Sequence, residues 1–144
     1  MNYNHYRNMA LQDFKHYNSL KASLDILPRQ IALLRNTGIY SAATGERVMH
    51  SVSTDEAVVA QISRIEHLQQ TLENNRARIA CIDAALNAVG KKDREMLFSF
   101  YINRQRGSVL NLARQDFTDR STLYRRAVRA LQRYVCICYG ITKE

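Results

Sequence analysis

A heptad repeat of apolar residues between Val58 and Val89 limits the folds open to this chain more than any other feature of the sequence. Eight of the ten positions on its two rows are apolar, and Gln61 and Asn75 are the two polar ones. The rows are Val58, Ile65, Leu72, Ile79 and Leu86, and Gln61, Leu68, Asn75, Ile82 and Val89. Such a period of 3.5 residues predicts a helix that lies along another helix for most of its length.

Two partners are compatible with this repeat. Leucines and isoleucines also recur at steps of four and three between Leu20 and Leu34, so residues 17–35 can fold back as the second helix of an antiparallel hairpin. The other partner is the same helix of a second subunit in a homodimer, where Asn75 would fix register or oligomeric state. If the helix over 17–35 is too short to reach it, Asn75 is solvated instead. The predicted self-association seam is Ile65, Leu68, Leu72, Asn75, Ile79 and Ile82.

The positions of the glycines, the proline and the capping residues favour helices throughout the sequence. Residues 36–53 are rich in Ser, Thr and Gly, which is typical of a connecting loop. Pro28 predicts a kink or a break in the first helix, and Ser53 begins the capping pattern of the second. With five glycines, one proline and no alternating β pattern, the fold class is all-α. We predict a long, coiled-coil-like helical hairpin over residues 1–89, followed by a C-terminal helix-turn-helix domain over residues 90–144.

The net charge of +8 is concentrated in the C-terminal part of the chain. Residues 89–144 contain 12 Lys or Arg and 5 Asp or Glu, whereas residues 1–88 contain 9 and 8. A basic segment of this kind favours a polyanionic partner, and nucleic acid fits better than a membrane because no apolar face accompanies the charge. No membrane association is expected. The cysteines, which have no metal-like spacing, predict reduced thiols and a cytoplasmic location; they are Cys81, Cys136 and Cys138.

An aromatic stripe at helical spacing lies near the N-terminus. Packing in a core or a subunit interface is its favoured role, and a base-stacking platform is the alternative. The stripe consists of Tyr3, Tyr6, Phe14 and Tyr17.

The basic segment has the spacing of a helix-turn-helix. A short helix over residues 108–115 is followed by a turn of three to four residues and by a long helix that begins at the cap Asp119. A third predicted helix begins after Gly90 and precedes these two. The interior positions of the two-helix motif are predicted to be Val109, Leu112, Ala113, Leu123 and Val128.

The exposed side of the second helix is the candidate binding surface. Residues 120–134 carry five arginines and no carboxylate, so pairs at i,i+4 within this stretch cannot neutralise them. Arg, Ser and Thr side chains bond base edges in the major groove, and the predicted base contacts are Arg120, Ser121, Thr122, Tyr124 and Arg125. The predicted phosphate contacts are Lys91, Lys92, Ser108, Arg126, Arg129 and Arg133. The alternative is a solvated helix face, or arginines that pair with acids elsewhere in the chain.

Residues 91–140 resemble region 4 of bacterial sigma factors, and more closely the sigma-region-4-like regulators of phages and prophages, including the RinA and ArpU types of late-gene activator. The resemblance covers roughly the last 50 residues. Asp116-Phe117 departs from it, because the family has Leu-Gly at this turn. The resemblance implies a DNA-binding activator that also contacts RNA polymerase, in a bacterial cell or a phage-infected host. The matching residues are Tyr101, Leu112-Ala113, Asp119-Arg120-Ser121-Thr122-Leu123-Tyr124-Arg125 and Tyr139-Gly140.

We therefore predict a sequence-specific DNA-binding transcriptional regulator of phage or prophage genes, with double-stranded DNA as its partner. Two other classes stay open, namely a small terminase subunit that packages DNA and a polymerase-binding adaptor that binds DNA weakly. A terminase subunit predicts a ring of many subunits, whereas a regulator predicts a monomer or a dimer. The sequence contains no metal-ligand spacing or nucleophile motif, so no catalytic residue, metal site or cofactor is expected.

Overall fold

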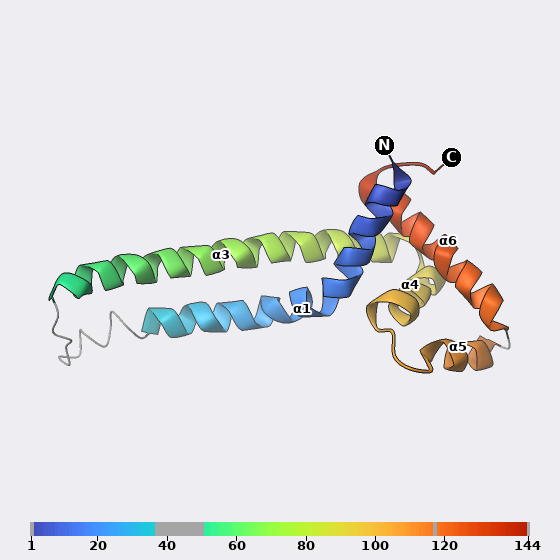
Figure 1. The fold of residues 1–144 in the computed structure, drawn as a ribbon, viewed down its shortest axis with the longest axis horizontal. Coiled ribbons are helices and arrows are strands. Elements are labelled where there is room, and N and C mark those ends of the chain that lie inside the picture. Colours follow the sequence, from blue (N-terminus) through green and yellow to red (C-terminus); the bar gives the residue numbers. More distant parts are fainter. Residues whose placement is uncertain (1, 37–50, 117, 144) are drawn as a thin grey trace. The chain divides into compact units, whose positions relative to one another are not determined.

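The computed structural model describes residues 2–36, 51–116 and 118–143, with only the backbone described at 51–54 (Figure 1). Of the described residues, 89% are helical, and no strand occurs among them. The prediction of an all-α chain is confirmed.

Five α-helices and one π-helical turn make up the described chain. They are α1 (Tyr3–Asn36), α3 (Ser51–Ala88), α4 (Lys91–Leu97), the π-helical turn η1 (Phe98–Ile102), α5 (Ser108–Asp116) and α6 (Arg120–Tyr139). α1 continues through Pro28 as one helix, so a break there is wrong, because a proline removes one amide donor and the flanking turns keep theirs; the alternative of a kink stays a prediction. α3 begins at Ser51, so Ser53 lies inside the helix and does not cap it. Most of the loop predicted over residues 36–53, namely residues 37–50, lies outside the described residues.

The described chain divides into two compact units. One is Ser19–Arg78, and the other combines Met1–Asn18 with Ile79–Glu144. The sequence suggested a division after residue 89 instead. The N-terminal turns of α1 and the last turns of α3 group with the C-terminal helices because they share one apolar core with them.

The unit Ser19–Arg78 contains parts of α1 and α3 that are joined by polar side chains of the heptad rows. The Asn75 amide donates to the Ser23 hydroxyl at 2.9 Å, and the Gln61 amide donates to the carbonyl of Leu34. Ile31 and Leu72 are its buried apolar residues among those described. Asn75 is therefore half-buried against α1 of the same chain, which reaches far enough to cover it.

The second unit has an aromatic core. Phe14 lies in contact with Tyr134, with ring centroids 4.7 Å apart, and stacks on Tyr101 at 6.1 Å. The Tyr17 hydroxyl donates to the Asp83 carboxylate at 2.6 Å. Phe14 and Tyr17 thus pack in the core, as the favoured interpretation of the stripe predicted. The fully buried large side chains of this unit include Phe14, Ile82, Leu86, Leu97, Leu123 and Tyr134.

α6 is held in this unit by α4 and α5, which both pack against it (Figure 1). Its N-terminus begins at Asp119, whose carboxylate accepts the backbone amide of Thr122 at 2.8 Å, and it ends at Gly140 with φ +64°. The predicted interior position Val128 is wrong, because its side chain is 56% exposed and Ala127 is buried instead. The inward row of α6 is Leu123, Ala127, Ala130, Leu131, Tyr134 and Val135.

Candidate nucleic-acid interface

The outward face of α6 carries the first part of the candidate interface. Ser121, Arg125 and Arg129 are exposed and recur every four residues, so they lie on one side of the helix. Thr122 is half-buried, and hydrogen bonds from Thr122 hold the pKa of the Asp119 carboxyl below its ordinary value. The Ser121 hydroxyl also donates to this carboxylate, at 3.3 Å. The cap fixes where α6 begins and therefore where these side chains point.

The two other predicted base-contact residues lie on a flank of α6, in a pocket that we call the arginine pocket. Arg120 and Tyr124 line it together with Arg104 and Arg106 from the segment between η1 and α5. The pocket has a volume of about 380 Å³, and no carboxylate is among its lining residues. Its complete lining is Arg104, Gln105, Arg106, Gly107, Val109, Leu110, Arg120 and Tyr124.

Tyr124 is fixed on this flank from two sides. Its ring meets the edge of Phe100 at a centroid distance of 5.2 Å and an interplanar angle of 80°. Its hydroxyl accepts a long hydrogen bond of 3.5 Å from the guanidinium of Arg104. Arg104 and Arg106 were not among the predicted contacts, although the basic Arg-Gln-Arg stretch at a helix break is a signal that could have indicated them.

The opposite flank of α6 forms a groove with α4 and α5, the carboxylate groove, of about 580 Å³. Arg133 pairs with Asp93 of α4, and Arg126 lies 3.9 Å from Asp116 of α5. Four cationic and three carboxylate side chains line this groove, so most of its charge is neutralised. The charged residues are Lys92, Arg126, Arg129 and Arg133, and Asp93, Glu95 and Asp116.

The structure thus separates the predicted phosphate contacts into different environments. Arg126 and Arg133 have carboxylate partners on other helices. For these two arginines the structure therefore has the alternative interpretation, in which they pair with acids elsewhere in the chain. Arg129 is exposed and has no ion pair within the described residues. The Ser108 hydroxyl donates to the carbonyl of Ser99 at 3.4 Å, and Lys91 and Lys92 are exposed in the first turn of α4.

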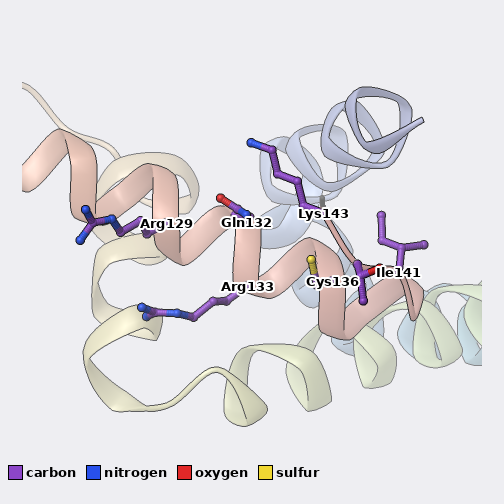
Figure 2. A pocket seen from close by; sticks show the side chains of 7 residues that line it. Arg129, Gln132, Arg133, Cys136, Ile141 and Lys143 are labelled. Carbon is purple, nitrogen blue, oxygen red and sulfur yellow. The ribbon is translucent and has the colours of Figure 1, made fainter. Parts of the chain in front are cut away.

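A third hollow of about 450 Å³ lies beside the C-terminal half of α6 and the tail after it. In Figure 2 the guanidinium groups of Arg129 and Arg133 extend away from Cys136 and Ile141. Lys143 places its ammonium over the Tyr3 ring, 4.8 Å from the centroid. The cations around this hollow therefore do not converge on one anion.

Burial raises the pKa of Tyr134 and that of the Cys138 thiol, so both stay protonated at neutral pH. In the described part of the chain, no three His, Cys, Asp or Glu side chains gather as a possible metal site.

None of the described helices is both long and apolar enough to cross a membrane. Comparisons of the chain with protein-family models, with curated proteins and with solved structures gave no match. The function is therefore inferred from the residues themselves.

Proposed function

We propose that this protein is a sequence-specific DNA-binding transcriptional regulator of phage or prophage genes. In this proposal α5, the turn that follows it and α6 are a helix-turn-helix, preceded by a helical hairpin of α1 and α3. α6 is the recognition helix and enters the major groove of duplex DNA.

The observation that carries the proposal is the charge of the outward face of α6. The helix has five arginines and no carboxylate over its 20 residues, and Arg125 and Arg129 are exposed. A solvated helix usually alternates charges of both signs on its surface. A face of one sign instead favours a polyanion.

The dimensions of α6 suit this role. At about 1.5 Å per residue, its 20 residues span about 30 Å, whereas the major groove is about 12 Å wide. The first turns can therefore lie in the groove while later turns cross the backbone. The inner face is fully used by the core, where Leu123 and Tyr134 are 0% exposed, so the outward face stays presented to a ligand.

Arg125 and Ser121 are the residues that we assign to base reading. They lie in the first two turns on the outward face, and an arginine fork donates to the O6 and N7 atoms of guanine. A serine hydroxyl bonds several base edges and contributes less discrimination. The carboxylate of Asp119 caps α6, and because the cap sets where the helix begins, it also sets where Arg125 and Ser121 point.

The experiment starts from duplexes selected by the wild-type protein from a random pool, and fluorescence anisotropy then measures binding to a selected and to a scrambled duplex. Arg125→Ala should cost about 1–3 kcal/mol of binding to the selected duplex and reduce the preference over the scrambled one. Arg114→Ala is the matched control, because Arg114 is an exposed arginine on α5 that lines none of the hollows described above. Equal effects of the two substitutions, or no enrichment of any duplex, would remove the assignment of α6 to base reading.

A further inference from the structure

The arginine pocket brings three guanidinium groups together from two separate segments of the chain. Arg104 and Arg106 come from the segment between η1 and α5, and Arg120 is the first residue of α6. None of the three has an ion pair within the described residues. Like charges gathered in this way repel one another, and an anion between them removes that repulsion.

The local fold explains why the arginines meet. The amide of Ser108 donates to the carbonyl of Gln105 at 3.0 Å, and the amide of Asn111 donates to the carbonyl of Gly107 at 2.9 Å. Gly107 has φ +83°, a left-handed conformation that a residue with a side chain rarely adopts. This tight turn starts α5 and places Arg104 and Arg106 beside the first turn of α6.

Tyr124 adds geometric order to the pocket. Its ring is packed on Phe100, and its hydroxyl accepts a long hydrogen bond from Arg104, so one guanidinium group lies beside this hydroxyl. Arg104 has other donors beyond the one that Tyr124 accepts, since a guanidinium carries five. Those donors are geometrically suited to two oxygens of one phosphate.

We propose that the arginine pocket binds a backbone phosphate of the duplex through Arg104, Arg106 and Arg120, which makes Arg120 and Tyr124 backbone-contact residues and leaves base reading to the outward face of α6. This inference rests on the proposed function and names the part of the DNA that the pocket takes. The pocket suits a phosphate rather than a base edge because it lies on the flank of α6 and its cations lack carboxylate partners. The carboxylate groove on the other flank is nearly neutral by comparison.

The test measures how the association constant for a random-sequence duplex falls with salt, for the full chain and for single substitutions in the pocket. Each phosphate contact contributes about 0.9 to the slope of log K against log salt. Arg104→Gln and Arg106→Gln should therefore each make the slope shallower, by up to about 1 for the one phosphate that the pocket holds, and leave the preference for a selected duplex over a scrambled one unchanged. Arg114→Gln is the control for loss of one positive charge nearby, and Arg104→Lys should keep most of the slope because it keeps the charge.

The outcomes separate the two proposals. A wild-type protein that binds duplex DNA with a steep slope, together with pocket variants that match Arg114→Gln, overturns the phosphate pocket and leaves the proposed function standing. The same pattern is expected if the pocket takes an acidic segment of a protein. Loss of sequence preference in Arg104→Gln also overturns the inference, because a phosphate contact carries no sequence information. Absence of duplex binding by the wild type, with thermal unfolding showing a folded protein, overturns both.

Discussion

The two flanks of α6 carry similar numbers of cations and differ in what surrounds them. On one flank, Arg104, Arg106 and Arg120 share a pocket that no carboxylate lines. On the other flank, Asp93 and Asp116 pair with Arg133 and Arg126. The contrast shows that the positive charge counted along a helix is not the charge that is available to a ligand. Availability depends on acids that other helices bring to the same side.

The comparison of the two flanks requires that α6 buries the face of Leu123 and exposes that of Val128. One substitution on each face tests this, and it is expected to give the largest change in the free energy of unfolding. Leu123 is 0% exposed and Val128 is 56% exposed. Leu123→Ala should lower the free energy of unfolding by about 2–5 kcal/mol, because it removes buried methyl groups and leaves a cavity. Val128→Ala should change it by less than about 0.5 kcal/mol, as is usual for a surface position. Urea unfolding followed by circular dichroism measures both, and a larger loss from Val128→Ala would mean that the flanks are assigned to the wrong sides.

Removing the carboxylates of the groove should make its flank resemble the arginine pocket. Asp93→Asn frees Arg133, and Asp116→Asn frees Arg126, so each variant gains one cation for the phosphate backbone. Each should bind duplex DNA about fivefold more tightly at physiological salt, with a salt slope steeper by about 1. Anisotropy titrations at several salt concentrations measure both quantities.

Glu95→Gln is the control for this experiment, because Glu95 lines the same groove and has no ion pair within the described residues. It removes the same charge without freeing an arginine, so it should shift the affinity less and leave the slope unchanged. If Glu95→Gln matched the two aspartate variants, the pairing of Arg126 and Arg133 would have no part in limiting the affinity.

The smallest effect is expected at Asp119, which sets the start of α6 for both flanks. Asp119→Ala removes the acceptor for the Thr122 amide and should lower the melting temperature slightly, whereas Asp119→Asn should keep most of it because asparagine also caps helices well. The pKa of Asp119 is lowered in the folded protein. The stability that comes from this cap is therefore fully present above the pKa of the unfolded chain and is lost as pH falls through the lower folded pKa. Melting curves at neutral and acidic pH should differ less for Asp119→Ala than for the wild type; an equal difference would show that the cap adds no pH-dependent stability.

The sequence predicted the local features of this fold better than the tertiary ones. The all-α class, the cap at Asp119 and the helices on either side of it follow from patterns within a few residues of one another, and the structure has them. The partner of Arg133 did not follow, because Asp93 lies 40 residues earlier and reaches it only when α4 packs on α6. The arginine pocket was missed for the same reason, since Arg104 meets Tyr124 across 20 residues.

Val128 shows a different limit. Val128 is a reasonable interior residue from its chemistry alone, but it lies five residues after Leu123, whereas Ala127, four residues after Leu123, shares its face of the helix. In the structure the small Ala127 and Ala130 are buried at 1% and 0% exposure, which lets the neighbouring helices approach α6 closely. A pattern that weights large apolar residues therefore mistakes the position by one residue. The physical cause is close helix packing, which favours small side chains at the contact.

The most direct test of the central claim is the salt dependence of wild-type binding to duplex DNA. With about four phosphates held, one by the arginine pocket and the others by Arg129, Lys91 and Lys92, log K should fall against log salt with a slope of roughly −4. A folded protein that binds with a slope near zero, or does not bind duplex DNA at any salt concentration, would contradict the account of α6 as a DNA-binding helix.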